Sequence, residues 1–419
     1  SGVSGVAAKT SFAAFLVKSL VESGALPRGH AAKALVFNAK GEDLFFLDKS
    51  NRHLREEDRR AYERLGLSPS PFGSVRFLAP PRKEEGSFLP DAETRLEGVE
   101  AYYWDLVQFC QEGLLPFVFG DTEATSNLGF LVQHVAERLK RLASGQKGPH
   151  LAVEDWPQGQ GMEEGIGFDA LGKVRLKSYA QLVRYIEYKL LGPEEGDGER
   201  GDPAWTARQA RATLEAFVRR LRSSVENLGH LVRGERPGNP PDPLKGAQVQ
   251  VVDIAKLHPQ AQGFVVGSLL RRLFAAKERG LYRAPVFVVL DELNKYAPRD
   301  GEGPIKEILL DIAERGRSLG VILIGAQQTA SEVERRVVAN AAIRVVGRLD
   351  PAEAERPEYR HLPASFRERA VMLPPGSLIL FQPDIPTPLL VRFPMPAWAT
   401  KREEVLEDNS AEALRREYF

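Results

Sequence analysis

The fold is predicted most directly from one segment, Val286-Phe287-Val288-Val289-Leu290-Asp291-Glu292. Its five consecutive apolar residues predict a strand that is buried on both faces, as in a parallel sheet covered by helices. Two carboxylates follow at once, and ligands of open α/β sheets bind at the carboxyl ends of the strands. One carboxylate there could hold a magnesium ion, and its neighbour could orient an attacking water. The alternative is a buried strand that happens to end in acidic residues.

The segments around this strand alternate between apolar strands and helices. Such alternation predicts an α/β fold with a mostly parallel sheet that is covered on both faces. One predicted helix, Ile305–Leu319, has Pro304 at its start and Gly320 at its end, which are positions that proline and glycine favour. The predicted strands are Lys33–Asn38, Val249–Ile254, Pro285–Leu290, Val321–Ile324 and Ile343–Val346, with Ser377–Phe381 and Leu389–Phe393 as a hairpin-like pair. The predicted helices of this part are Gln262–Lys277, Ile305–Leu319 and a first helix from Thr10 to the closing Gly24.

The middle of the chain has a different composition. Pro/Gly-rich, charged loops are predicted from Pro69 to Pro90, and mostly helical structure from Ala92 to Arg233. The segment Arg233–Lys245 has the composition of a linker. We therefore predict a discontinuous core domain at 1–75 and 245–398, a largely helical insertion at 76–244, and a C-terminal tail or brace at 399–419.

Composition excludes several classes of protein. The 419 residues include 43% hydrophobic and 27% charged side chains, which excludes a largely disordered chain, a collagen-like fibre and a coiled-coil rod. Lys and Arg number 57, as do Asp and Glu, so a nucleic-acid surface would have to be a local patch or a ring built by oligomerisation. The single cysteine, Cys110, excludes a disulfide framework and fits a reducing cytosol. No apolar run approaches the ~18 residues that cross a bilayer, so we expect a soluble cytoplasmic protein without membrane partners.

The N-terminal stretch Ser4-Gly5-Val6-Ala7-Ala8-Lys9-Thr10-Ser11 offers the groups that bind a phosphate. They are backbone N–H groups at a helix start, a lysine and a hydroxyl that can reach a metal. Compared with the usual G-x-x-x-x-G-K-[ST] pattern, Ala8 replaces the second glycine, and Gly2 lies one position early. The alternative is a helix start made of small residues. Because such a loop normally follows a strand, we expect a longer protein that extends N-terminally.

Two further features are candidates for catalysis. The apolar strand Ile322–Ile324 leads to Gln327, whose amide could sense a γ-phosphate, although it could also simply cap the strand. Arg315 and Arg317 lie at the end of one predicted helix, and Arg344 lies on the next strand. An arginine supplied across a subunit interface can be worth ~10³–10⁵ in rate. The alternative is that these arginines are solvated surface residues.

In this order, the motifs resemble those of the HerA branch of the HerA–FtsK ATPases. The resemblance covers roughly 1–60 and 246–395, and the helical middle matches mainly by position. The segments that carry it are Lys9-Thr10, Phe37-Asn38-Ala39-Lys40-Gly41-Glu42-Asp43-Leu44, Val251-Val252-Asp253-Ile254, Leu290–Pro298, Ile312–Gly320 and Ser331-Glu332-Val333.

The resemblance implies a RecA-like P-loop NTPase core, a hexameric ring, and ATP-driven translocation of double-stranded DNA. It also implies an N-terminal β-barrel domain beyond this chain, and a partner that is a NurA-type nuclease or another effector, in DNA repair or antiviral defence. Lys9 would contact the β- and γ-phosphates of ATP, Thr10 and Asp291 would hold Mg²⁺, and Glu292 would polarise water. Gln327 would be the sensor, with Arg317 and Arg344 ahead of Arg315 as arginine fingers.

Three functions remain open at this point. The first is a ring-forming ATPase that translocates DNA, with the loops Arg299–Gly303 and Gln328–Glu334 as candidates for DNA contact. The second is a secretion or conjugation motor that moves protein or nucleoprotein cargo. The third is a nucleotide-stabilised scaffold for an effector, with little turnover, which the alanine at position 8 favours.

Overall fold

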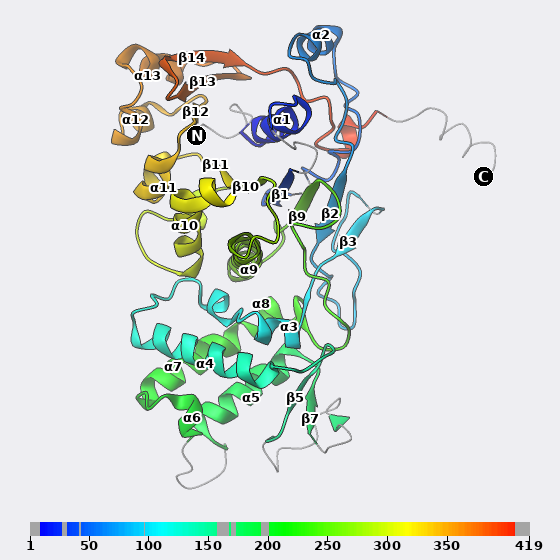
Figure 1. Cartoon of the computed structure of the whole chain (residues 1–419), viewed down its shortest axis with the longest axis vertical. Helices are drawn as coiled ribbons and strands as arrows, with labels where there is room; N and C mark the ends of the chain where they lie inside the picture. The colour runs from blue at the N-terminus through cyan, green and yellow to red at the C-terminus, as the bar shows by residue number, and fades with distance from the viewer. Residues whose placement is uncertain are drawn as a thin grey trace, which may run out of the picture.

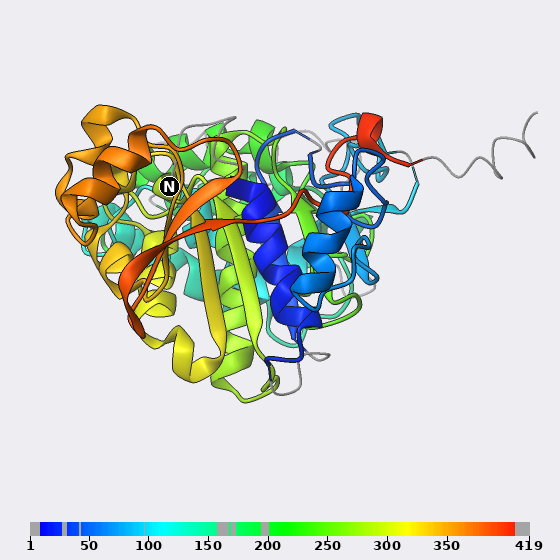
Figure 2. The same ribbon diagram turned by 90° about the horizontal axis from the view of Figure 1, so that it is seen from above.

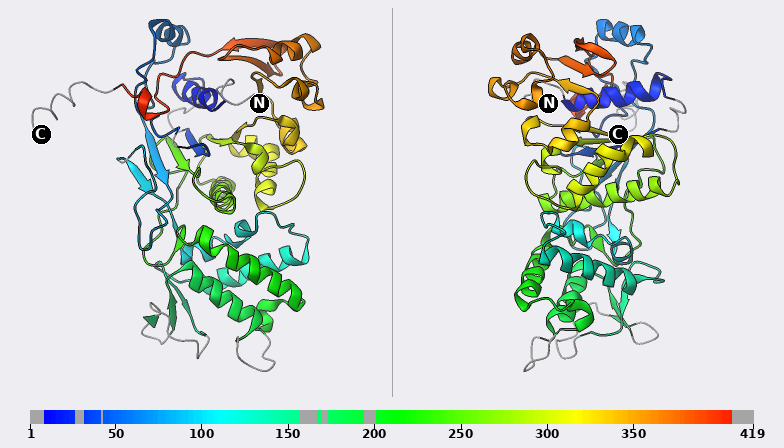
Figure 3. Two further views of the ribbon diagram at one scale, coloured as in Figure 1. Left: turned by 180° about the vertical axis from the view of Figure 1, so that it is seen from behind. Right: turned by 60° about the vertical axis from the view of Figure 1, so that its left-hand side comes forward.

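The computed structural model describes residues 9–26, 32–41, 43–95, 97–156, 167–168, 173–193 and 201–406. The predicted phosphate-loop residues Ser4, Gly5, Val6, Ala7 and Ala8 lie outside this range, as does the end of the predicted tail. Along the long axis of the molecule, a small antiparallel sheet with short helices lies at one end, a parallel sheet in the middle, and a mostly helical part at the other end (Figures 1 and 3).

The central sheet confirms the predicted α/β fold. In the described part of the chain it has six strands in the order β11-β10-β1-β9-β2-β3, and every neighbouring pair is parallel. Parallel strands of this kind require helices on both faces. The strands are β1 (Lys33–Asn38), β2 (Val75–Ala79), β3 (Val99–Ala101), β9 (Val249–Asp253), β10 (Val286–Asp291) and β11 (Val321–Ala326).

Strand β10 shows how one apolar run serves two cores. Val286, Val288 and Leu290 point into the core shared with α9, whereas Phe287 and Val289 point into the core beneath α1. Because side chains alternate along a strand, both sets are buried. The covering helices are α1 (Lys9–Glu22) on one face, and α9 (Pro259–Glu278) and α10 (Pro304–Leu319) on the other (Figures 1 and 2).

One prediction for the sheet is wrong. The composition of Pro69–Pro90 predicts loops, but Val75–Ala79 forms β2, which pairs with β9 and β3 inside the sheet. Its five residues are flanked by glycine and proline, and their strand conformation depends on the pairing with neighbours distant in sequence. The domain boundaries stay a prediction. Two strands of the sheet nevertheless belong to the segment predicted as the insertion: β2 overlaps its start, and β3 lies within it.

The helical part packs onto α9 through one continuous apolar core. The ring of Phe117 lies against Gly267 of α9, where a Cβ would clash with the ring, so glycine lets the two layers approach. The helices of this part are α3 (Leu106–Gln111), η2 (Leu115–Phe119), α4 (Asn127–Ala143), α5 (Tyr179–Leu191), α6 (Pro203–Thr206), α7 (Arg211–Ser223) and α8 (Val225–Leu228). Its short strands are β4 (Trp104–Asp105), β5 (Leu151–Val153), β6 (Gly167–Phe168), β7 (Val174–Leu176) and β8 (Val232–Arg233).

The C-terminal part confirms the predicted hairpin. Strands β12 (Arg344–Val346), β13 (Ser377–Gln382) and β14 (Ile385–Arg392) form an antiparallel sheet with a small core of its own. The described start of the predicted tail packs on its own chain, with Ala399 N donating to Lys49 O at 2.8 Å. The remaining elements are α2 (Glu56–Arg64), η3 (Leu293–Lys295), η4 (Ala330–Glu332), α11 (Arg335–Asn340), α12 (Pro351–Ala354), η5 (Pro357–Tyr359), α13 (Ala364–Val371) and η6 (Arg402–Glu404). Within the described ranges, the structure contains no helix with the length and apolar character of a membrane span.

Candidate active site

Polar side chains gather where β1, β9 and β10 end, and we call this the carboxyl edge. The three strands finish with Asn38, Asp253 and Asp291, and Asn38 pairs with Asp253 in register. Asn38 Nδ2 donates to Asp253 Oδ1 at 3.0 Å. Parallel strands bring their carboxyl ends to one edge of the sheet, which is where α/β proteins bind ligands. Asn38 and Asp253 were not assigned a role from the sequence, although the same rule applies to them.

Helix α1 brings its first residues to this edge. Thr10 Oγ1 donates to Asp291 Oδ2 at 3.4 Å, which joins positions 281 residues apart in the sequence. Lys9 begins the helix, and its Nζ is buried without a hydrogen-bond partner in the part of the chain that the structure describes. A buried ammonium that lacks a partner is costly, so this position suits an anionic ligand. Ser11 follows in the first turn of α1.

Lys40 is a further residue of this site to which the sequence patterns assign no role. It follows β1, and its Nζ lies 3.1 Å from Asp291 Oδ2 and 2.8 Å from Glu292 Oε1. The lysine therefore bridges both carboxylates of the pair. Lys40 belongs to the segment that carries the family resemblance, but the loop conformation that points it at Asp291 could not be deduced from residue types.

The backbone at Glu292 is unusual. Its φ of 51° and ψ of 51° lie in the left-handed region, which costs a residue with a side chain roughly 1–2 kcal/mol. Glu292 N donates to Asp291 Oδ1 at 2.9 Å, which fixes the two carboxylates relative to each other. Leu293 then packs against Gly325 of β11, where a Cβ would clash with the leucine side chain. Strain of this kind is concentrated at functional sites.

Charges at the carboxyl edge change one another's pKa. For Lys9, burial first and then repulsion from Lys40 lower the pKa, and attraction by the two carboxylates opposes them only partly. For Lys40, partial burial favours a lower pKa, but the bonds to Glu292 and Asp291 outweigh it and raise the pKa. Burial favours a higher pKa at Glu292, yet hydrogen bonds from Lys40 and Gln328 lower the pKa overall.

The two glutamines after β11 have different surroundings. Gln328 Nε2 donates to Glu292 Oε1 at 3.2 Å, so the residue after the predicted sensor is the one that contacts the carboxylate. Gln327 Oε1 is buried and lacks a hydrogen-bond partner among the described residues. An unsatisfied buried amide is available to a ligand or to water. Gln327 thus keeps its predicted role as a proposal.

Two of the three candidate arginines, Arg317 and Arg315, are not brought to the carboxyl edge by their own chain. Val286 N, at the start of β10, donates to Gly320 O at 2.9 Å, so Arg317 near the end of α10 lies close to the opposite edge of the sheet. The five steps from Val286 to Asp291 span ~16 Å. Arg315 lies near the same end of α10 and forms ion pairs with Glu278 at 3.4 Å and Asp311 at 3.2 Å.

The remaining arginines differ in how they are held. Arg344 lies on β12, and its Nε donates to Ala341 O at 3.3 Å. The exposed side chain of Arg317 has no ion-pair or hydrogen-bond partner within the described ranges. Arg317 is therefore the least constrained of the three candidates.

The residues at the carboxyl edge fit a divalent cation held in part by a ligand. Among the described residues, no group of three or more His, Cys, Asp or Glu side chains could hold a metal by itself. Mg²⁺ usually takes one or two protein oxygens and completes its shell with waters and phosphates. Thr10 Oγ1 and Asp291 Oδ2 supply such a pair of oxygens, and the unpartnered Lys9 supplies a charge for the phosphate.

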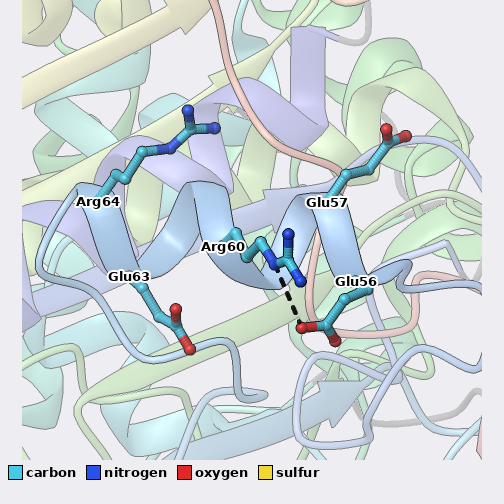
Figure 4. A pocket seen from close by; sticks show the side chains of 5 residues that line it. All are labelled: Glu56, Glu57, Arg60, Glu63 and Arg64. Atoms are coloured by element: carbon cyan, nitrogen blue, oxygen red, sulfur yellow. Dashed lines mark ion pairs between the residues drawn. The ribbon is translucent and has the colours of Figure 1, made fainter.

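A depression beside α2 is a weaker candidate. Figure 4 shows that its five side chains all come from this one helix. Arg60 Nε lies 3.6 Å from Glu56 Oε1. All five are exposed, so their charges are solvated and no buried polar group awaits a partner. The carboxyl edge is the site with buried, preorganised charge. The five side chains are those of Glu56, Glu57, Arg60, Glu63 and Arg64.

Comparisons with known proteins support the fold. No family model matches the chain. It is 20% identical over 248 residues to the DNA double-strand break repair helicase HerA of Pyrococcus furiosus, a match that covers 52% of this chain and 44% of that protein. The chain therefore matches less than half the length of this curated relative.

Two solved structures resemble nearly the whole chain. VirB4 of Thermoanaerobacter pseudethanolicus has a TM-score of 0.50 at 12% identity, covering 94% of this chain and 87% of its own. The bacterial conjugative coupling protein TrwBΔN70 has a TM-score of 0.51 at 12% identity, covering 97% and 86%. These likenesses show an α/β fold of the RecA-like P-loop type. With the HerA match they support the HerA–FtsK superfamily, without singling out its HerA branch.

Proposed function

We propose that this chain is a HerA-type ATPase that uses ATP to translocate double-stranded DNA. The observation that carries the proposal is the start of α1. Lys9 Nζ is buried without a described partner, and the next residue, Thr10, contacts Asp291 across the sheet. A triphosphate would satisfy the ammonium and receive the positive end of the helix dipole.

The roles of the side chains follow from this placement. Lys9 binds the β- and γ-phosphates, and Thr10 and Asp291 would hold Mg²⁺, which when bound neutralises phosphate charge. Glu292 orients water for attack, since its pKa is lowered and it is ionised at neutral pH. Gln328 holds Glu292, and Gln327 acts as the sensor of the γ-phosphate. The phosphate loop Ser4–Ala8 and Ser11 complete the binding site for the nucleotide.

An arginine from a neighbouring subunit completes the site. Arg317 lies near the opposite edge of its own sheet and has no described side-chain partner, so we assign it to the nucleotide of the adjoining protomer. Arg344 is the second candidate, and Arg315 the third because it is already paired within its chain. A hexameric ring would supply such a contact at every site. It would also reconcile zero net charge with DNA binding, because loops of one kind would line the pore.

Two loops connect the nucleotide to the DNA in this proposal, Arg299–Gly303 and Gln328–Glu334. A backbone hydrogen bond joins them, in which Arg299 N donates to Glu332 O at 2.8 Å. Lys306 Nζ also lies 2.8 Å from Glu334 Oε2. Because one loop begins at Gln328, which contacts Glu292, a change at the carboxylate pair would move both loops together.

A second function is favoured by the extent of the structural likeness. VirB4 and the conjugative coupling protein TrwB resemble nearly the whole chain, whereas the HerA match covers about half. A secretion or conjugation motor would use the same nucleotide chemistry with protein or nucleoprotein cargo. We place the DNA translocase first because the match to HerA is a match in sequence, whereas the likeness to VirB4 and TrwB is one of structure at 12% identity. Its expected partner is a NurA-type nuclease or another effector.

The proposal is tested by ATP hydrolysis with Mg²⁺, with and without linear double-stranded DNA at low salt. DNA translocation predicts hydrolysis that DNA stimulates several-fold and that high salt suppresses, because phosphate contacts dominate DNA affinity. Hydrolysis that is indifferent to DNA supports the secretion motor. Nucleotide-dependent assembly without turnover supports the scaffold instead. A failure to bind adenine nucleotides contradicts all three.

A further inference from the structure

One oxygen of Asp291 is contacted by two different groups. Thr10 Oγ1 lies 3.4 Å from Asp291 Oδ2, and Lys40 Nζ lies 3.1 Å from the same atom. The other oxygen, Oδ1, accepts from the backbone of Glu292. Oδ2 is therefore the oxygen that remains for a cation next to Thr10, and an ammonium contacts it.

Lys40 neutralises part of the negative charge of Asp291 and Glu292, which would otherwise repel each other. Asp291 and Glu292 are neighbours whose side chains are 7% and 12% exposed. Two shielded carboxylates need a counter-charge, since removing one partner of a shielded ion pair is strongly unfavourable. A divalent cation on Asp291 Oδ2 would provide that charge in place of the lysine.

The backbone of the loop that carries Lys40 is held by a hydrogen bond, whereas the Lys40 side chain is partly exposed to solvent. The Asn38 side chain donates to Gly41 O, and Gly41 has a φ of +56°, which turns the chain back toward the sheet. The Lys40 side chain is 40% exposed, so it can swing into solvent without opening the core.

We propose that Lys40 occupies the position of the divalent cation in the metal-free protein and competes with that cation for Asp291 Oδ2. Metal binding then displaces the ammonium and frees Glu292 Oε1 from it at the same moment. Lys40 is thus a positioning residue that keeps Glu292 engaged until the metal arrives. The proposal rests on the proposed function, because that function places the metal on Thr10 and Asp291.

The test measures Mn²⁺ binding to the whole chain without nucleotide, by electron paramagnetic resonance. Removing the competing charge in Lys40→Gln should tighten Mn²⁺ binding at least tenfold, whereas Lys40→Arg should bind like the wild type. Lys256→Gln is the matched control, because Lys256 also bridges two carboxylates, at 3.1 and 2.9 Å, and should change nothing. Adding Asp291→Asn to Lys40→Gln should abolish the gain, which places the ion at this carboxylate.

A second measurement uses the wild-type protein and so does not depend on how a variant folds. Mild acylation followed by mass spectrometry reports how available each lysine amine is. Mn²⁺ should increase labelling of Lys40 several-fold and leave Lys256 unchanged. Unchanged Mn²⁺ affinity in Lys40→Gln, or unchanged labelling of Lys40 at Mn²⁺ levels that bind, overturns the competition.

The two proposals fail in different ways. If wild-type protein shows Mn²⁺-dependent nucleotide binding while Lys40→Gln gains nothing, the competition is wrong and the proposed function stands. If neither wild type nor variant binds Mn²⁺ with or without ATP, the metal site itself is wrong, and both proposals are overturned.

Discussion

Lys40 and Lys256 each bridge a pair of carboxylates, but the two ion-pair groups have very different surroundings. Lys40 lies 3.1 and 2.8 Å from Asp291 and Glu292, and Lys256 lies 3.1 and 2.9 Å from Asp91 and Glu93. The distances are nearly the same, but Asp91 and Glu93 are 34% and 76% exposed, against 7% and 12% for the other pair.

The difference shows that the role of such an ion pair depends on how far its carboxylates are shielded from water and on the other charged groups beside them. Water solvates the charges around Lys256, so breaking that bridge leaves no group stranded. At the carboxyl edge, Lys9 lies nearby with no described partner, and Thr10 shares an oxygen with Lys40. The ammonium of Lys9 is thus left without a bond to the protein that the structure describes, which is typical of a site that binds a charged ligand.

The largest expected effect separates the two glutamates. Glu292→Gln should lower ATP turnover ~10⁴-fold, because a general base of this kind is worth up to about that factor. Nucleotide affinity should stay within a few-fold of the wild type. Glu93→Gln, the matched change at the exposed bridge, should leave turnover unchanged. Equal rates for the two variants, measured by phosphate release, would remove the distinction between the sites.

A smaller loss is expected for an arginine that the chain leaves free. Arg317→Ala should lower turnover ~10³-fold, the lower end for an arginine finger, with nucleotide binding intact. Arg315→Ala is its control, since Arg315 is already paired with Glu278 and Asp311 and should affect turnover little. In mixed rings, Arg317→Ala subunits should lower the activity of wild-type neighbours. Activity that falls only in proportion to the mutant fraction would place the arginine in its own site.

Lys9→Ala should weaken binding of an ATP analogue by ~10–100-fold, the loss of a charge-assisted hydrogen bond. The Tm of the nucleotide-free protein should not fall, because the ammonium is buried without a described partner. Lys256→Ala should leave nucleotide affinity unchanged. Isothermal titration calorimetry measures both affinities. A clear loss of Tm in Lys9→Ala would show that the lysine is held by protein contacts instead.

The lowered pKa of Lys9 predicts a pH dependence of nucleotide binding. Below this pKa the ammonium is charged and binds phosphate, so affinity should fall several-fold as the pH rises toward the ordinary lysine value of 10.5. In that range binding should take up a proton, which calorimetry in buffers of different ionisation enthalpy detects. The sign for stability is opposite, because the unfolded chain binds the proton more strongly and folding therefore gains as the pH rises. A Lys9→Met variant should lose the proton uptake.

The smallest effect is expected at the exposed bridge itself. Lys256→Gln should change the free energy of unfolding by less than ~1 kcal/mol, as is usual for an ion pair at the surface. A thermal melt compares this variant with the wild type. A large destabilisation would show that the two bridges are more alike than their exposure suggests.

Much of the sheet could be predicted because its strands are continuous apolar runs. The predicted strand over Lys33–Asn38 is confirmed to the residue, and α10 begins one residue earlier than predicted, at Pro304. Helix α9 begins three residues before its prediction, at Pro259, since proline suits a first turn. Strand β2 was missed because its local sequence is short and surrounded by loop formers.

The candidate site could be predicted in part for a similar reason. Asp291 and Glu292 follow a buried strand, so their place at the carboxyl edge follows from topology alone. Lys40 and Gln328 lie in loops, and their contacts with Glu292 depend on backbone geometry that residue types do not specify. Asn38 and Asp253 could have been assigned to this edge from the sequence, since Asn38 ends one predicted strand and Asp253 lies one residue before the end of another.

The central claim is that a nucleoside triphosphate binds between Lys9 and the Asp291–Glu292 pair. A crystal or electron cryo-microscopy structure of the full chain with Mg²⁺ and a non-hydrolysable ATP analogue tests it most directly. We predict the γ-phosphate within hydrogen-bond distance of Lys9 Nζ, with Mg²⁺ on Thr10 and Asp291 and Lys40 displaced from Asp291 Oδ2. A nucleotide bound elsewhere, with Lys9 still unpartnered, would contradict the account.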